Sequence, residues 1–290
     1  MTRPMARRPS WRPGQSWFGG AGVAVVLALS LLVTAPSGPA GAKTRKLPAD
    51  LAMFANCPVN VKGVTVCLFS STSSTTFEIG STTVSSTSPT TLSLGLSQTQ
   101  TGPLTAVLPD NGTQALQSPA IPLPGGLTGI QGLSGGDLSV TATPQLVGLP
   151  TVNLGALLTA SGPGLTLPID VLVSTPSGLL GPDCTIGDQA SPITLNLTTG
   201  TTDPPAPNTP ITGAVGTLSS DNQGLLTDDG ITLVDNAFAV PGTDNCGTDG
   251  VLDEVLDLDK SLPSAAGNNT AILSGSSYTA PAKLIRRYLR

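Results

Sequence analysis

The stretch Leu165-Thr166-Leu167-Pro168-Ile169-Asp170-Val171-Leu172-Val173 carries an apolar side chain at every second position from its first residue to its last. Ile193-Thr194-Leu195-Asn196-Leu197 repeats the alternation. A period of two is typical of a β-strand that buries one face, because successive side chains point to opposite sides of a sheet. Glycine or proline bounds each segment, and we predict separate strands on the two sides of Pro168.

The rest of the chain extends this pattern. Residues 92–96 alternate in the same way, and 16 of the 22 residues from 70 to 91 are serine or threonine, a composition that favours strands over helices. The 34 glycines and 27 prolines supply turns. Helix is expected to be scarce, and the best candidates are residues 251–256 and the C-terminal residues 283–290, which we expect to be a ragged end. The sequence therefore predicts an all-β fold, an antiparallel sandwich or barrel with long Gly/Pro/Thr-rich loops.

Residues 1–42 are predicted to be a signal peptide. Arginines at positions 3, 7, 8 and 12 precede an apolar run over residues 19–34, and the small residues Ala40 and Ala42 fit a cleavage site after Ala42. The apolar run is shorter than the ~20 residues that a membrane-spanning helix needs. We therefore expect export and removal of the segment rather than anchoring by it.

Cleavage leaves residues 43–290, which are 290 − 42 = 248 residues with nine lysines and arginines against 18 acids. We predict a single secreted β-rich domain, with a subdivision near residues 198–213 as the alternative because residues 203–210 are rich in proline. Residues 43–55 are expected to be a frayed start. No second apolar segment of bilayer length follows, so the protein is expected outside the cell or in the cell envelope.

Four cysteines in an exported chain predict two disulfides. Residues 57–67 are predicted to form a β-hairpin whose loop, residues 61–63, ends in Gly63. In that hairpin Cys57 faces Cys67, which leaves Cys184 to pair with Cys246. Zinc is the competing interpretation, but it calls for closely paired ligands, and the chain has no histidine and no C-x-x-C motif.

Between Lys62 and Lys260 the chain contains no lysine or arginine over 197 residues, and it has no histidine at all. Nucleic-acid binding needs cations that neutralise phosphates. Most nucleophilic and general acid–base mechanisms need an imidazole or amine that titrates near neutral pH. The composition therefore predicts no nucleic-acid partner, no cofactor and no enzymatic activity.

Acidic residues gather late in the chain, and Asp249, Asp253 and Asp257 are the candidate calcium ligands. Aligning this segment with a calcium loop places Leu256 where the bidentate carboxylate belongs. We therefore predict solvated loop acids and no metal. A carboxylate-dependent hydrolase remains an alternative, although only two glutamates, Glu78 and Glu254, are present.

Three stretches carry a resemblance: Asp183-Cys184-Thr185-Ile186-Gly187 with the run that follows to residue 202, Leu233-Val234-Asp235-Asn236-Ala237-Phe238 up to Cys246, and Leu262-Pro263-Ser264-Ala265-Ala266-Gly267 up to Leu273. Together they resemble a group of uncharacterised secreted proteins of actinobacteria. The resemblance implies export and a β-rich body, and it implies no activity, cofactor or catalytic residue.

The sequence as a whole predicts a secreted or envelope-associated, non-catalytic β-protein with a structural or surface-interaction role, and cell-envelope components as its partners. The first alternative is an extracellular module that binds a small ligand or a glycan through Asn and Asp side chains in residues 221–245. The second is the carboxylate-dependent hydrolase. No feature of the sequence sets an oligomeric state.

Overall fold

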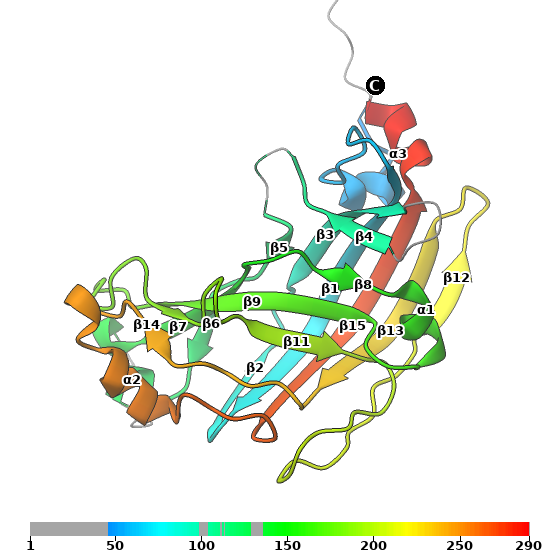
Figure 1. Cartoon of the computed structure of the whole chain (residues 1–290). Helices are drawn as coiled ribbons and strands as arrows, with labels where there is room; N and C mark the ends of the chain where they lie inside the picture. Colours follow the sequence, from blue (N-terminus) through cyan, green and yellow to red (C-terminus); the bar gives the residue numbers. More distant parts are fainter. Residues whose placement is uncertain (1–45, 99–103, 111, 113, 129–135, 290) are drawn as a thin grey trace, which may run out of the picture. The chain divides into compact units, whose positions relative to one another are not determined.

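The computed structural model of the chain describes residues 46–98, 104–110, 112, 114–128 and 136–289. The predicted signal peptide, 1–42, and its cleavage site at Ala42 lie outside these residues. The described residues belong to one compact unit, 44–290. In this part of the chain fifteen strands form one antiparallel sheet (Figure 1), so the all-β antiparallel prediction is confirmed.

The strands are β1 Val64–Ile79, β2 Thr82–Ser86, β3 Thr91–Gln98, β4 Leu104–Val107, β5 Leu116–Gln117, β6 Ile121–Leu123, β7 Val140–Leu146, β8 Thr151–Val152, β9 Leu165–Ser174, β10 Thr185–Ile186, β11 Ile193–Leu197, β12 Thr217–Ser220, β13 Leu226–Asp235, β14 Thr243–Asp244 and β15 Asn269–Pro281. The α-helices are α1 Leu154–Thr159, α2 Asp253–Lys260 and α3 Ala282–Leu289. The 3-10 helices are η1 Ala49–Phe54, η2 Gly126–Thr128, η3 Gly136–Leu138 and η4 Thr248–Gly250.

Two long strands organise the sheet. β1 pairs with β15 along one edge and with β3 and then β2 along the other. β9 pairs with β8 and β7 along one edge and with β11 and β10 along the other. β4 links the two groups through β3 and β8. In Figure 1, β9 and β11 cross in front of β1, β15 and β13, so the one sheet makes two layers.

The backbone pairing also closes back onto β13, at the edge of β13 that does not pair with β15. Thr198, directly after β11, exchanges two backbone hydrogen bonds of 3.0 and 2.9 Å with Val234 of β13. Ala214 and Thr232 exchange two more of 2.9 Å each. The two layers are therefore joined at both sides by backbone pairing, and the main hydrophobic core lies between them.

Gly275 lies at a bend in the β15 ladder. Both neighbouring strands carry a bulge opposite it, because the pairing shifts past Ser73 on β1 and past Gly230 on β13. Bulges increase the local twist and bend a strand. A Cβ atom added at Gly275 would overlap the carbonyl oxygen of Ser71 and would lie 2.7 Å from the Cα of Thr72. Only glycine therefore lets the backbones approach this closely.

The alternating stretches form strands as predicted, with one correction. β9 buries every second residue from Leu165 to Val173, and β11 does the same from Ile193 to Leu197. However, Pro168 does not divide β9. The carbonyl oxygen of Pro168 accepts a hydrogen bond from the N–H of Val147, which lies in the segment between β7 and β8. In a strand the N–H and C=O of one residue point to the same edge, so the missing N–H of Pro168 faces this segment, where β7 has already ended. A proline is tolerated there because no ladder bond is lost.

The Cys57–Cys67 disulfide is present, but the predicted hairpin around it is wrong. Residues 57–63 form successive turns, with Val59 N bonded to Cys57 O and Val64 N to Val61 O, and β1 begins only at Val64. A strand has two edges, and those of β1 are taken by β3 and β15. The segment before Val64 therefore packs over the end of the sheet and reaches Cys67 through its side chain.

Both ends of the described unit are ordered, which corrects two expectations. The predicted frayed start contains η1, whose Leu51 and Phe54 are buried. The predicted ragged end contains α3, whose Leu284 and Ile285 are buried, and Arg286 donates two hydrogen bonds to the carbonyl oxygen of Val59. These residues form a second hydrophobic cluster around the Cys57–Cys67 disulfide, separate from the main core. We call it the terminal core.

The proline-rich segment 203–210 is held against the strands on both sides of it. Thr201 and Thr212 form a bridge at its base. The Nδ2 group of Asn208 donates to the carbonyl oxygens of Asn236 and Asn269 at 2.9 and 2.8 Å. The Cys184–Cys246 disulfide spans the segment as well. Residues 198–213 are therefore a tied loop of the compact unit.

Asp228 on β13 is a buried carboxylate among leucines. The residue is 7% exposed and its Oδ1 atom has no hydrogen-bond partner. It lines a small hollow with five leucines, Ile231, Ser277 and Thr279. Burial raises the pKa of Asp228 above its ordinary value of 3.8, and this outweighs the lowering effect of the hydrogen bond from the Gly216 backbone. The charged form is therefore less favourable in the folded protein than in the unfolded chain.

We expect Asp228→Asn to stabilise the protein by about 1 kcal/mol at neutral pH. Because the folded-state pKa is the higher one, the folded protein binds more protons between the two pKa values. The wild-type free energy of unfolding therefore rises as pH falls through the raised pKa toward 3.8. Urea unfolding at pH 7 and about pH 3.5 should show an advantage for the variant that disappears in acid. Exposed Asp203→Asn is the control, and an advantage independent of pH would contradict the prediction.

Candidate interaction surface

Helix α2 presents apolar side chains to solvent. Its inward-facing residues Leu256 and Lys260 are 2% and 7% exposed, whereas Val255 and Leu258 are 51% and 86% exposed. Val251, just before the helix, is 68% exposed. Positions 251, 255 and 258 are spaced by four and three residues, so they lie on one side of this segment. An amphipathic helix usually turns such a stripe toward the core, and here the stripe faces outward.

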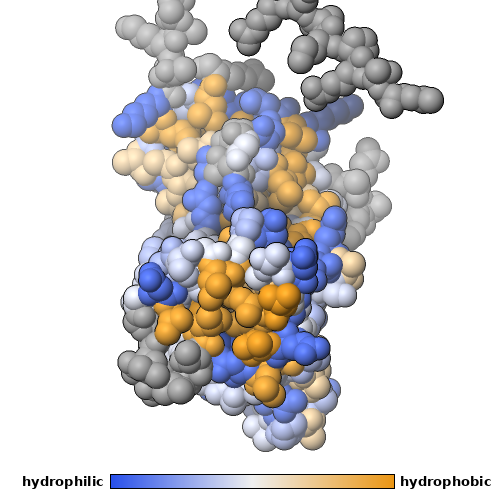
Figure 2. All heavy atoms as spheres, turned by 90° about the vertical axis from the view of Figure 1, so that its left-hand side faces the viewer, coloured by the Kyte–Doolittle hydropathy of each residue, from blue (hydrophilic) through white to orange (hydrophobic). Residues whose placement is uncertain are grey.

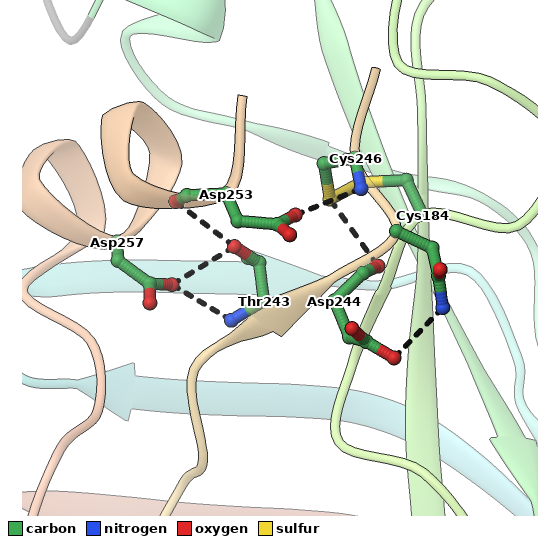
Figure 3. Close-up of a disulfide and its surroundings, with 7 residues drawn as sticks. Cys184, Thr243, Asp244, Cys246, Asp253 and Asp257 are labelled. Carbon is green, nitrogen blue, oxygen red and sulfur yellow. Dashed lines mark hydrogen bonds between the residues drawn. A yellow bond between two sulfur atoms is a disulfide. The ribbon is translucent and has the colours of Figure 1, made fainter. Parts of the chain in front are cut away.

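Hydrogen bonds from β14 fix the orientation of α2 (Figure 3). The Oδ1 atom of Asp257 accepts from the backbone N and the Oγ1 of Thr243 at 2.7 and 2.9 Å. The Oδ1 atom of Asp253 accepts from Cys246 N at 2.8 Å, and Thr243 Oγ1 also donates to the carbonyl oxygen of Asp253. Asp253 and Asp257 are four residues apart and therefore lie on the same side of the helix. These contacts prevent α2 from rotating to bury Val255 and Leu258.

A disulfide secures the strand that holds α2. Cys184 and Cys246 are bonded and fully buried, directly before β10 and shortly after β14. β10 and β14 pair through Thr185 with Asp244 and Ile186 with Thr243. The predicted second disulfide is thus present, and it joins the segment carrying α2 to the ladder of β9.

The C-terminal end of α2 is fixed by its lysine. The Nζ atom of Lys260 donates to the carbonyl oxygens of Pro124 and Gly126 at 3.3 and 3.1 Å and lies 2.7 Å from Asp259 Oδ2. A cation in the last turn also interacts favourably with the helix dipole. The buried side of α2 is therefore held by Leu256 in the main core and by polar contacts of Asp253, Asp257 and Lys260, while Val255 and Leu258 face solvent.

The exposed apolar surface extends beyond the helix. Leu179 is 51% exposed and lies next to Leu180, whose carbonyl oxygen accepts from Gly247 N. Leu138 is 40% exposed and follows Asp137, whose carbonyl oxygen accepts from Ser177 Oγ. Figure 2 faces the side of the unit on which α2 lies and shows hydrophobic residues gathered together with hydrophilic ones around them. We call the exposed apolar residues of α2 and of these neighbouring segments the α2 surface, and they are Leu138, Leu179, Val251, Val255 and Leu258.

The border of the α2 surface is acidic. Its exposed carboxylates come from the same segments as the apolar residues, and they are Asp137, Asp183, Asp244, Asp249 and Glu254. Lys260 is the one cation on these segments, and it is buried against Asp259. The surface therefore combines a hydrophobic centre with a negatively charged rim, an arrangement typical of an interaction site.

The candidate calcium ligands do not converge. Asp253 and Asp257 use carboxylate oxygens to hold Thr243 and Cys246, and Asp249 lies exposed in η4 with a φ angle of 56°. The described residues include no group of three or more His, Cys, Asp or Glu side chains that could hold a metal ion. The structure gives two of the three carboxylates a role in anchoring α2.

Several of the side chains suggested for glycan binding are also engaged within the fold. Asp221 Oδ1 accepts from Gln223 N and Leu225 N, both at 2.8 Å. Asp235 accepts from Asn196 N and Ala237 N, and the side chain of Asn236 donates to Thr209 O. These groups stabilise their own turns and strands.

Surface hollows offer little acid–base chemistry. A hollow of about 380 Å³ is lined by Ser, Pro, Ala and Val residues, among them Ser191, Pro241 and Ser264, with no titratable side chain. Another of about 320 Å³ contains Asp259 and Lys260, which are paired with each other. A smaller cavity of about 60 Å³ between the two layers is lined only by apolar side chains and Pro144. The α2 surface is therefore the feature with the clearest chemical character.

Comparison of the chain with family models, with curated proteins and with solved structures finds no match. Within the described residues, no helix is long and apolar enough to cross a membrane. The two disulfides are compatible with an oxidising, extracellular compartment.

The short helix predicted at residues 251–256 is found as α2 at Asp253–Lys260, two residues later at its start and four at its end, and the exposed apolar side of this helix was not predicted. The 251, 255, 258 spacing was visible in the sequence. The sequence alone did not show whether these three side chains face the core or solvent, because that depends on the contacts of Asp253, Asp257 and Lys260 with segments distant in sequence.

Proposed function

We propose that this protein is a secreted or envelope-associated β-protein of the kind found in actinobacteria, and that it acts without catalysis by binding a partner through the α2 surface. The observation that carries the proposal is the outward apolar side of α2. Burying that side would be easy for a free helix, but hydrogen bonds and a disulfide hold it in solvent.

Energy considerations support the proposal. Leaving a large apolar side chain in water forgoes about 1.5–3 kcal/mol of burial free energy for each residue. Here Val251, Val255 and Leu258 are all more than half exposed on one segment. Single exposed apolar residues are ordinary, but a contiguous patch with a polar rim marks an interaction site.

The test is saturable binding of labelled protein to isolated envelopes of the producing cells. We expect Val255→Ser with Leu258→Ser to weaken this binding at least about tenfold, because both side chains lose the apolar area buried on contact. The matched control is Leu149→Ser, since Leu149 is 60% exposed in the loop between β7 and β8. Equal binding by the double variant and the wild type would contradict the proposal.

A further inference from the structure

Exposed cations gather around the terminal core. Lys46 precedes η1, Lys62 lies in the turns before β1, and Lys283 and Arg287 lie on α3, and all four side chains are exposed. Among the described residues the one ion pair joins Lys260 and Asp259, so none of these four cationic side chains forms an ion pair there. Among the described residues every lysine and arginine except Lys260 belongs to the segments that form the terminal core.

This basic end also has apolar surface. Leu289 at the end of α3 is 44% exposed. Leu47, Met53 and Tyr288 are only partly buried against the terminal core. Like the α2 surface, the basic end thus combines apolar side chains with charge, and the charge has the opposite sign.

Strand β15 separates the two regions. α3 follows the last residue of β15 directly, whereas α2 ends close to where β15 begins, because Ser261 lies beside Ser81 in the turn between β1 and β2. β15 has 13 residues, which span roughly 40 Å at the usual rise of a strand. α2 and α3 accordingly lie far apart in Figure 1. One molecule therefore cannot bring its own basic end onto its own α2 surface.

We propose that the partner bound by the α2 surface is the basic end of a second copy of this chain, so that molecules associate head to tail. This inference rests on the proposed function and names its partner. The α2 surface supplies Val255 and Leu258 with an acidic rim, and the basic end supplies Leu289 with Lys283 and Arg287. In a head-to-tail contact each molecule uses one of its two surfaces and leaves the other free. Association therefore continues into an open chain or closes into a ring.

Charge decides between this arrangement and a two-fold dimer. Two α2 surfaces facing each other would bring two acidic rims together, and two basic ends would bring together lysines and arginines. Like charges across an interface are unfavourable, whereas opposite charges attract and are screened by salt. Head-to-tail contact is the pairing that matches apolar area with apolar area and acid with base.

The experiment is sedimentation velocity of the exported protein with its disulfides intact, over a range of protein and salt concentrations. One variant, Val255→Ser with Leu258→Asp, changes the α2 surface, and the other, Lys283→Glu with Arg287→Glu, changes the basic end. All four positions are exposed, so circular dichroism melting should show both variants folded. We expect wild-type mass to rise with protein concentration and to fall as salt is added.

Each variant alone should remain monomeric, with association at least about tenfold weaker than that of the wild type. Mixed one to one, the variants should form dimers and nothing larger, because each supplies the surface that the other lacks. A mixture that stays monomeric while the wild type associates would overturn the head-to-tail arrangement. Dimers of either variant alone would also overturn it, in favour of a two-fold contact.

A wild type that stays monomeric at all concentrations would overturn self-association. The proposed function would then be judged separately by the envelope-binding measurement. Loss of envelope binding on Val255→Ser with Leu258→Ser would still support an α2 partner, which would then be a different molecule. The two proposals can therefore fail independently.

Discussion

Replacing Cys184 and Cys246 together by alanine is expected to lower the free energy of unfolding by about 4 kcal/mol. The disulfide closes a loop with a sequence separation of 62 residues, so its loss returns much conformational entropy to the unfolded chain. It also releases the segment on which Asp253 holds α2 through Cys246 N. Urea unfolding under identical conditions measures the effect.

The matched control is the Cys57→Ala, Cys67→Ala pair, whose sequence separation is only 10 residues. The same loop-entropy argument gives about 3 kcal/mol for it. We expect the long-loop variant to be the less stable of the two and to show faster hydrogen exchange in α2. If its loss were below about 1 kcal/mol, the structural importance assigned to the Cys184–Cys246 bond would be wrong.

Gly275→Ala is expected to destabilise the protein by about 3 kcal/mol. The added methyl group would overlap backbone atoms of Ser71 and Thr72, and a backbone cannot give way as a flexible side chain can. To relieve the overlap, β15 would have to move away from β1, although β15 also pairs with β13 through the same segment. Chemical denaturation is the measurement.

Ser277→Ala provides the control for Gly275→Ala. Ser277 lies two residues further along β15, and its change to alanine removes an atom rather than adding one. We expect a change of no more than about 0.5 kcal/mol there. A similarly small effect of Gly275→Ala would show that the close approach of β15 and β1 is not required.

The alternation in β9 and β11 was enough to predict an antiparallel β-protein, because each strand buries one face against the main core. Local sequence could not reveal which strands pair. Pro168 shows why: whether a proline interrupts a strand depends on which neighbour its missing N–H faces, and here it faces the gap between β7 and β8. That neighbour is set by the fold as a whole.

The cysteines illustrate a correct conclusion reached through a wrong local structure. Cys57 and Cys67 pair as predicted, but by way of consecutive turns rather than a hairpin. The sequence distance limits how far apart the two cysteines can be, and several backbone conformations meet that limit. The buried start and end of the unit were missed because η1 and α3 bury their apolar residues against each other and against segments distant in sequence, among them β1 and β15.

Residues 183–202, 233–246 and 262–273 lie together in the fold. Thr198 pairs with Val234, Val240 pairs with Ser264, and Asn269 Nδ2 donates to Phe238 O. Asn269 is fully buried and its Oδ1 also accepts from Gly80 N, so its polar groups are well satisfied. The physical role of these stretches is to join the two layers, whereas the α2 surface lies outside most of their length.

The proposed function requires the apolar side of α2 to be exposed in the free protein and covered where the protein acts. The most direct measurement is carbene footprinting read by mass spectrometry at Val255 and Leu258, comparing dilute purified protein with protein in place on the producing cells. We predict heavy labelling of both residues in dilute solution and strong protection on cells, with Leu149 labelled equally in both. Equal labelling of Val255 and Leu258 in the two states would contradict the account.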